Sequence, residues 1–143
     1  MDTIVDIETL NSRLKDMLDI AYEEAKCSDY GFFHHGAVLF RGPKVINSGH
    51  NSNGFTRWVR QPRHIREEGS ILLTHAEHSA LKNVPREKVR GATMFAVRRN
   101  SLGDLRNSRP CPSCQHEMKI RGVKRCYYSI DNDTIGILDF RHG

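Results

Sequence analysis

Apolar residues recur at steps of three and four in the first part of the chain, as they do along one face of an amphipathic helix. The recurring positions are Ile7, Leu10, Leu14, Met17, Leu18, Ala21 and Ala25. Most of the positions between them are polar or charged. The pattern therefore predicts a helix over residues 6–26 that packs as an outer layer of the fold.

Segments rich in β-branched and aromatic residues follow this helix and predict strands. They are HHGAVLF at 34–40, KVINSGH at 44–50 and ATMFAVRR at 92–99. Gly42 and Pro43 lie between the first two segments and mark a tight turn. We therefore expect the first two strands to form an antiparallel hairpin.

Two further strands are predicted near the end of the chain, at RCYYSI (125–130) and IGILDF (135–140). Only the residues DNDT (131–134) lie between them. A parallel crossover needs about a dozen residues or more, whereas a short run of polar, turn-forming residues suits a hairpin. The last two strands should therefore be antiparallel.

Two shorter helices complete the predicted elements. Thr74 and Glu77 fit a capping box, which predicts a helix that starts at about His75. Pro112 suits the first turn of another helix, and Gly122 suits its end. The order helix, two strands, helix, strand, helix, two strands predicts an α/β protein with a three-layer α/β/α fold and a mixed five-stranded sheet.

Length and composition place limits on the class of protein. A chain of 143 residues with 38% hydrophobic content is expected to form one domain over residues 1–143. A net charge of +5 and a pI near 9.2 favour an anionic partner such as a nucleotide or a nucleic acid, although many basic proteins bind neither. No apolar run approaches the roughly 18 residues that span a bilayer, and the N-terminus lacks the features of a signal peptide. We therefore expect a cytoplasmic protein with no membrane partner.

The chemistry-bearing residues are His75, Glu77, Cys111 and Cys114. A Cys-x-x-Cys pair in a chain expected to be intracellular suits metal binding or redox chemistry better than a structural disulfide. His75 and both cysteines fall at predicted helix N-termini, where backbone N–H groups favour a thiolate over a thiol. A redox pair without a metal remains an alternative, as does a structural zinc site beside an unrelated surface glutamate.

The chain reads H-A-E from His75 to Glu77 and P-C-x-x-C from Pro110 to Cys114. This pattern resembles the zinc-dependent deaminases of the cytidine deaminase superfamily. The resemblance implies Zn²⁺ held by His75, Cys111 and Cys114, with Glu77 as the group that transfers protons. It implies hydrolytic deamination of a cytosine base to uracil in a small nucleoside or nucleotide, such as cytidine, deoxycytidine or dCMP. It also implies a homo-oligomer.

The proposed ligand set accounts for the residue types. One imidazole and two thiolates leave the fourth tetrahedral position of zinc open for water, which distinguishes a catalytic site from a structural one. Zinc can lower the pKa of such a water from about 15.7 towards about 7. His78 and His116 follow the two motifs on the predicted helices, and we expect both side chains to face away from the metal.

Candidate substrate contacts lie on both sides of a polar loop at residues 52–73 and within it. Asn51 is part of SGHNSNG, which resembles the G-x-N segment of deoxycytidylate and tRNA-editing deaminases, where an asparagine hydrogen-bonds the substrate. Ala76, the middle residue of H-A-E, is expected to line the same pocket. Arg57 and Trp58 lie in the loop and could contact a phosphate and stack on a base. An oligomer contact or a solvated loop is the alternative for this pair.

Two features affect the assignment of a substrate. Residues 98–109 separate the third strand from P-C-x-x-C, depart from the family pattern, and are expected to form a β-hairpin at the rim of the site. Antiparallel last strands resemble those of free-nucleoside cytidine deaminases, whereas His75 and the G-x-N segment resemble the nucleotide and tRNA enzymes. The alternatives are therefore a deaminase of cytosine or adenine in single-stranded DNA or RNA, and an inactive zinc-stabilised nucleic-acid-binding module.

Overall fold

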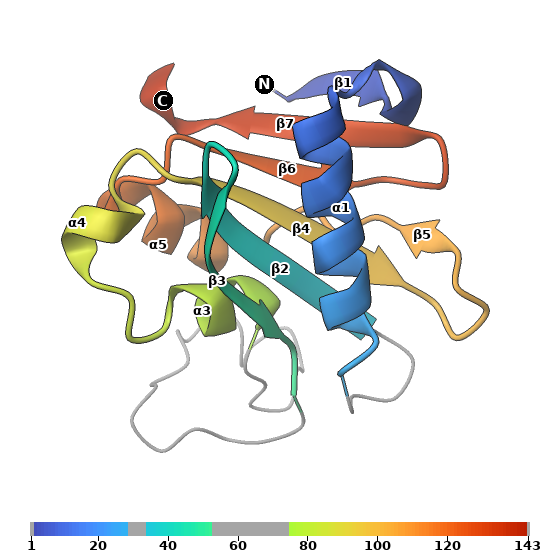
Figure 1. Cartoon of the computed structure of the whole chain (residues 1–143), viewed down its shortest axis with the longest axis horizontal. Coiled ribbons are helices and arrows are strands. Elements are labelled where there is room, and N and C mark those ends of the chain that lie inside the picture. Colours follow the sequence, from blue (N-terminus) through green and yellow to red (C-terminus); the bar gives the residue numbers. More distant parts are fainter. Residues whose placement is uncertain (1, 29–33, 53–74, 143) are drawn as a thin grey trace.

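The computed structural model describes residues 2–28, 34–52 and 75–142, which form a central β-sheet covered by helices on both faces (Figure 1). The strands lie in the order β1-β7-β6-β4-β2-β3, and β5 pairs with β4 beside this path. The strands are β1 Thr3–Asp6, β2 His34–Arg41, β3 Lys44–His50, β4 Thr93–Arg99, β5 Leu105–Arg106, β6 Arg125–Ser129 and β7 Thr134–Asp139. The helices are α1 Ser12–Ala25, α3 Ala76–Leu81, α4 Arg86–Val89 and α5 Pro112–Arg121, with 3-10 turns η1 Ile7–Thr9 and η2 Phe140–His142.

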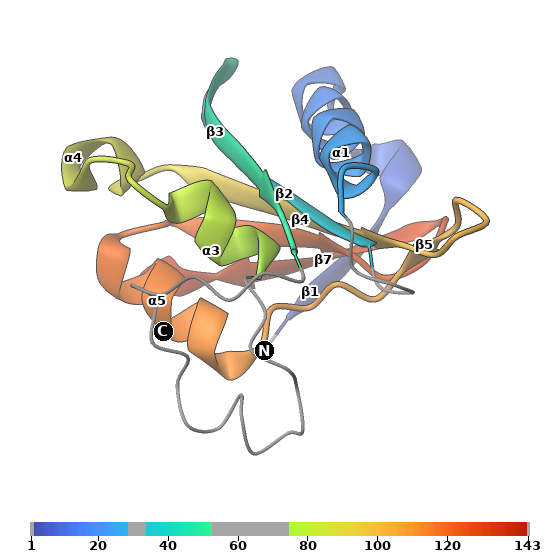
Figure 2. The same ribbon diagram turned by 90° about the horizontal axis from the view of Figure 1, so that it is seen from below.

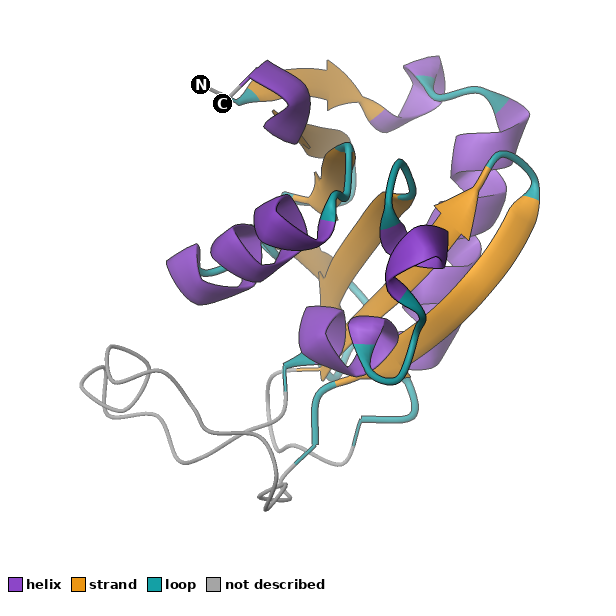
Figure 3. Ribbon diagram, turned by 90° about the vertical axis from the view of Figure 1, so that its left-hand side faces the viewer, coloured by secondary structure: helices purple, strands orange, loops and turns teal. Residues whose placement is uncertain are grey.

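The sheet separates two hydrophobic cores. Successive side chains of β2 and β4 point to opposite faces, as the pleat of a strand requires. Val38 and Phe95 are buried beneath α1, whereas Leu39 and Met94 are buried beneath α3 and α5. Figure 2 shows α1 on one side of the sheet with α3 and α5 on the other, and Figure 3 shows the same layers from the side. The predicted three-layer α/β/α fold is therefore confirmed.

The strand pairing is mixed, as predicted. β2 is antiparallel to β3 and to β4, β4 is parallel to β6, and β6 is antiparallel to β7. The last two strands are therefore antiparallel, as the short link at residues 131–134 indicates. Asp131 closes this link by accepting hydrogen bonds from the main-chain N–H groups of Asp133 and Thr134.

The number of strands differs from the prediction, because the sheet has seven strands within the described residues, whereas five were expected. The first additional strand, β1, is a short and mainly exposed edge strand that pairs with β7. Its four residues are too few for a clear alternation of polar and apolar positions. The second additional strand, β5, turns the insertion at residues 98–109 into the expected hairpin, because it runs antiparallel to the end of β4.

The first helix begins later than predicted. Residues 6–26 were expected to be helical, but α1 starts at Ser12. Asn11 caps it, since its side chain accepts a hydrogen bond of 2.9 Å from the main-chain N–H of Leu14. Ile7 and Leu10 lie before this cap yet pack against the same core as α1, and this is why their spacing matched a helical pattern.

Two local features set the positions of α3 and α5. A Cβ atom on Gly49 would lie 2.6 Å from the main-chain nitrogen of Ala80, so α3 lies directly against β3. Helix α5 starts at Pro112 and ends at Gly122, which adopts a left-handed conformation with φ of 90°. Both boundaries of α5 agree with the prediction.

Two further predictions concern the polar loop before α3 and the start of α3 itself. The polar loop was placed at residues 52–73, and all of it except Ser52 falls outside the described residues. Thr74 of the predicted capping box also lies outside them. His75 is the N-cap residue of α3, so this helix begins one position after the predicted start. Among the described helices, none combines the length and apolarity needed to cross a bilayer.

Candidate active site

Three side chains of types that can bind a metal meet at the starts of two separate helices. His75 immediately precedes α3, Cys111 immediately precedes α5, and Cys114 lies in the first turn of α5. The Nδ1 atom of His75 lies 3.6 Å from Sγ of Cys111 and 3.4 Å from Sγ of Cys114. All three ligand atoms lie within 4.8 Å of one another. The sequence therefore identified side chains that the fold brings together over a separation of 36 residues or more.

These distances fit a zinc ion. With Zn–S near 2.3 Å, Zn–N near 2.0 Å and tetrahedral angles, nitrogen and sulfur ligands lie about 3.5 Å apart. The two measured Nδ1–Sγ distances, 3.6 and 3.4 Å, bracket this value. One imidazole and two thiols are also the donor types that zinc prefers. The three residues present thus match the metal in both chemistry and spacing.

The two thiols differ in acidity. Hydrogen bonding from the thiol of Cys114, assisted by His75, lowers the pKa of Cys111 to about 4. The same hydrogen bond, together with burial, raises the pKa of Cys114. The lowered pKa favours the thiolate form of Cys111, and this is the form that binds a metal.

Glu77 is a buried carboxyl group next to the three ligands. Its side chain belongs to the first turn of α3, and the residue is only 6% exposed. Burial raises the pKa of Glu77, while the nearby His75 opposes this effect. A buried carboxyl group that retains a proton more readily than usual is suited to general acid–base catalysis. Ala76, between His75 and Glu77, is also buried.

The segment before Cys111 is held by a set of hydrogen bonds. The hydroxyl of Ser108, which is buried, donates to the main-chain oxygen of Ala96 in β4 at 3.0 Å. The guanidinium of Arg109 donates to both carboxylate oxygens of Asp2, at 2.7 and 3.3 Å. These contacts attach the chain between the β5 hairpin and α5 to the sheet on one side and to the N-terminal segment on the other, and they fix where Cys111 enters the site.

Asn51 follows β3 and is buried, with 4% of its surface exposed. Its Oδ1 atom accepts hydrogen bonds from the main-chain N–H of His35 at 3.0 Å and from the hydroxyl of Ser28 at 2.5 Å. This oxygen joins the end of β3 to the start of β2 and to the segment after α1. The orientation of the amide is therefore fixed, while a contact between Asn51 and the substrate stays a prediction.

His35 and Arg98 are site candidates that sequence reasoning missed. They pair across β2 and β4, and strand alternation places both on the face that carries α3 and α5. Burial lowers the pKa of His35 to about 4, with further contributions from Arg98, His75 and His34. His35 is thus a neutral imidazole within electrostatic range of a metal ligand. No motif spacing marks these two residues, because strand register alone brings them to the site.

The remaining candidates from the sequence are the loop residues Arg57 and Trp58 and the histidines His78 and His116. Arg57 and Trp58 lie outside the described residues, so their predicted substrate contacts stay predictions. His116 is exposed on α5. His78 faces a neighbouring helix, with its Nδ1 atom 3.2 Å from both carboxylate oxygens of Glu117 in α5. It does not belong to the group of metal ligands found among the described residues.

Replacement of His78 by alanine should leave the zinc content unchanged and alter turnover by no more than about tenfold. The expected cost is one hydrogen bond between α3 and α5, or about 1 kcal/mol of stability. Zinc analysis, kcat and thermal unfolding of the variant test this expectation, with His75→Ala as the comparison that should lose the metal. A His78→Ala protein that lacks zinc would show that the wrong histidine has been assigned to the ligand set.

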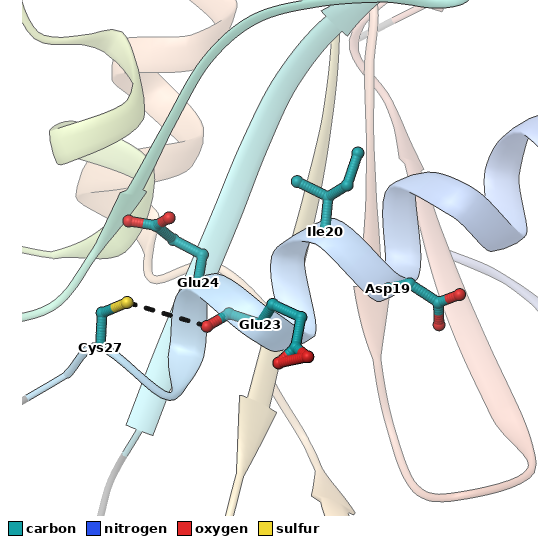
Figure 4. Close-up of a pocket in the computed structure, with 5 residues that line it drawn as sticks. All are labelled: Asp19, Ile20, Glu23, Glu24 and Cys27. Atoms are coloured by element: carbon teal, nitrogen blue, oxygen red, sulfur yellow. Dashed lines mark hydrogen bonds between the residues drawn. The ribbon is translucent and has the colours of Figure 1, made fainter.

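A separate cavity lies on the other face of the sheet. It has a volume of 390 Å³ and runs along α1, where Asp19, Ile20, Glu23, Glu24 and Cys27 line it (Figure 4). The Sγ atom of Cys27 lies 3.9 Å from the main-chain oxygen of Glu23. Because α1 and the metal ligands lie on opposite sides of the sheet, this cavity is not part of the candidate active site.

Comparison with known proteins agrees with the fold and the site. A three-layer α/β/α fold with a His-Cys-Cys cluster and a buried glutamate is typical of zinc-dependent deaminases. The model of the family described as "Cytidine and deoxycytidylate deaminase zinc-binding region" matches residues 11–130. The chain therefore belongs to the cytidine and deoxycytidylate deaminase family, and its cofactor is zinc. No match was found among curated proteins.

Solved structures with the same fold include dCMP deaminase from the cyanophage S-TIM5. Its complex with dCMP and dUMP has a TM-score of 0.55 and 20% identity, over 83% of this chain and 82% of that one. Its apo form has a TM-score of 0.52 and 18% identity, over 83% and 84% of the two chains. RibD from Acinetobacter baumannii has a TM-score of 0.49 and 18% identity, over 81% of this chain and 27% of that one.

Proposed function

We propose that the protein is a hydrolytic deaminase that converts a cytosine base to uracil and ammonia in a small nucleoside or nucleotide, such as cytidine, deoxycytidine or dCMP. One observation carries the proposal: the candidate ligand atoms of His75, Cys111 and Cys114 lie within 4.8 Å of one another. The buried Glu77, two positions from His75, supplies the carboxyl group that the reaction needs. Membership of the deaminase family supports the same reaction class.

The residues of the site have distinct roles in this proposal. His75, Cys111 and Cys114 would hold zinc, which would act as a Lewis acid and lower the pKa of a water molecule towards neutral pH. Glu77 accepts a proton from the attacking water and delivers protons to the N3 atom of the ring and to the leaving amine. A C–O bond forms at C4 of the base, the C4–N bond breaks, and ammonia departs. The burial that raises the pKa of Glu77 suits a group that must hold a proton between these transfers.

The remaining site residues are proposed to bind the substrate. Ala76 follows His75 directly, Asn51 is buried at the end of β3, and a buried amide can discriminate between donors and acceptors on a base or sugar. Arg57 and Trp58 stay candidates for contacts with a phosphate and a base. The cyanophage dCMP deaminase, whose structure includes dCMP and dUMP, makes a pyrimidine nucleotide a reasonable first substrate to test.

Ammonia release from a panel of compounds tests the function directly. The panel comprises cytidine, deoxycytidine, CMP, dCMP, adenine and guanine nucleosides, and single-stranded DNA and RNA oligonucleotides. We expect turnover of a small cytosine compound, with formation of the corresponding uracil product. Turnover of oligonucleotides alone would replace this proposal with a nucleic-acid deaminase. A zinc-loaded protein that releases ammonia from none of them would favour an inactive binding module.

A further inference from the structure

Positive charge is concentrated in two short segments that contribute no ligand to the metal site. Residues 82–90 and 119–124 together contain seven lysines and arginines and a single carboxylate, Glu87. Their combined charge of +6 exceeds the +5 of the whole chain, so the rest of the chain carries a charge of −1. The basic character of the protein therefore comes from this one region.

The fold joins the two segments into a single surface. The main-chain N–H of Gly91 donates to the oxygen of Gly122 at 2.7 Å, and the N–H of Lys124 donates to the oxygen of Ala92 at 2.9 Å. The guanidinium of Arg121 donates to the main-chain oxygen of Leu81 at 2.8 Å. The region around α4 is thus held against the C-terminal end of α5.

Two neighbouring cavities lie on this surface. One has a volume of 790 Å³ and the other 220 Å³, and both include Arg41 and Glu87 in their linings. We call their cationic lining the α4–α5 basic surface. It consists of Arg41, Lys44, Arg86, Lys88, Arg90, Lys119 and Arg121. Among the described residues, seven cationic side chains and one carboxylate, Glu87, therefore line the two cavities.

Two of these arginines are held in place by hydrogen bonds to neutral main-chain oxygens, so no carboxylate neutralises their charge there. Arg41 donates to the main-chain oxygens of Lys88 and Arg90, and Arg121 donates to those of Leu81 and Val84. Carbonyl oxygens carry no net charge, so both guanidinium groups keep their positive charge. Fixed guanidinium groups lose little conformational entropy when they bind a phosphate.

We propose that the α4–α5 basic surface binds the phosphodiester backbone of a single-stranded nucleic acid. A row of cationic side chains can neutralise several successive phosphates, and each contact adds affinity through release of counterions. Arginine is well suited to phosphate because its planar fork donates two parallel hydrogen bonds.

The lining favours a polymer over a free nucleotide. Among the described residues that line the two cavities there is no aromatic side chain on which a base could stack, and the apolar members are Val45, Ile46 and Ile120. The surface should therefore bind phosphates whatever the base sequence. It lies at the C-terminal end of α5, whereas Cys111 and Cys114 lie at the opposite end, about 15 Å away along the helix axis. The inference is thus independent of the proposed deamination reaction.

The proposal is tested by the binding of fluorescently labelled dT20 and rU20. Fluorescence anisotropy measures the affinity at KCl concentrations from about 50 to about 200 mM. The test variant is Arg86→Glu/Arg90→Glu, in which two exposed arginines of the surface are reversed in charge. The matched control is Arg13→Glu/Lys15→Glu on α1, which changes the net charge by the same amount at exposed positions on the other face of the sheet. Zinc content and thermal unfolding of both variants verify that each protein is folded.

We expect wild-type protein to bind both oligonucleotides with an affinity that falls steeply with salt. The Arg86→Glu/Arg90→Glu variant should bind at least tenfold more weakly, and the slope of log K against log salt should fall by about 1.4, which corresponds to two lost phosphate contacts on a single strand. The control should stay within about threefold of wild type. Equal losses in the two variants would overturn the proposal, because they would reflect net charge or another binding region. Absence of wild-type binding at the lowest salt concentration would also overturn it.

Discussion

Replacement of Glu77 by glutamine should abolish most deamination while leaving the zinc site and the fold intact. Glutamine has nearly the same shape as glutamate and retains hydrogen bonding, but it cannot accept a proton from water and pass it on. Turnover should therefore fall by at least the roughly 10²- to 10⁴-fold attributed to general acid–base catalysis. Zinc should remain, because the three ligand atoms that lie together come from His75, Cys111 and Cys114 and not from Glu77.

The matched control for this change is Glu117→Gln. Glu117 undergoes the same chemical replacement on α5, but its carboxylate faces His78 and is partly exposed. We expect its zinc content to match wild type and its kcat to stay within about tenfold of the wild-type value. Both variants should be measured side by side for kcat, KM and metal content on the substrate that the panel identifies. Near wild-type turnover by Glu77→Gln would remove Glu77 from the proposed mechanism.

Sequence patterns predicted the central strands well because burial on both faces leaves a strong signal. Residues 34–40 and 92–99 were expected as strands, and β2 and β4 occupy nearly the same positions. Both strands pack between the two hydrophobic cores, so their side chains are apolar in an almost continuous run. Strand β1 had no such signal, because it is short and mainly exposed at the edge of the sheet.

The start of α1 shows what a hydrophobic pattern reports. Ile7 and Leu10 fit the helical spacing, yet Ile7 lies in a 3-10 turn and Leu10 follows it. Both pack against the α1 core, so the pattern recorded which side chains are buried and not which backbone is helical. The cap at Asn11 determines where the helix begins, and a single polar residue of this kind is easily overlooked in a periodic pattern.

The candidate metal ligands could be recognised in the sequence because each lies at the start of a helix, in a motif of fixed spacing. His35 and Arg98 could not, because they reach the same face through the pairing of two strands that are distant in sequence. The α4–α5 basic surface was hidden for a similar reason. Its arginines come from α4, α5 and the end of β2, and only the fold collects them around one hollow.

Replacement of Cys111 by serine should remove zinc and destabilise the protein. A hydroxyl group is a far weaker zinc ligand than the Cys111 thiolate, and only His75 and Cys114 would remain of the ligand cluster. Zinc affinity should fall by more than the roughly 10- to 100-fold that loss of an outer-shell partner causes. Wild-type protein should contain about one zinc per chain, and Cys111→Ser should contain little after dialysis.

The loss of stability follows from linkage between metal binding and folding. A ligand that binds only the folded state at about 100 times its Kd stabilises that state by about 2.7 kcal/mol. For a chain of this size, such a loss corresponds to a decrease of about 5–10 °C in Tm.

The matched control is Cys27→Ser, because Cys27 is exposed and lies outside the ligand cluster. Wild-type protein treated with a chelator should melt at the temperature of Cys111→Ser, whereas that variant should not respond to the chelator. If Cys111→Ser retained a full complement of zinc and the Tm of wild type, then Cys111 would not be a ligand, and the arrangement of one histidine and two cysteines would have to serve a different chemistry.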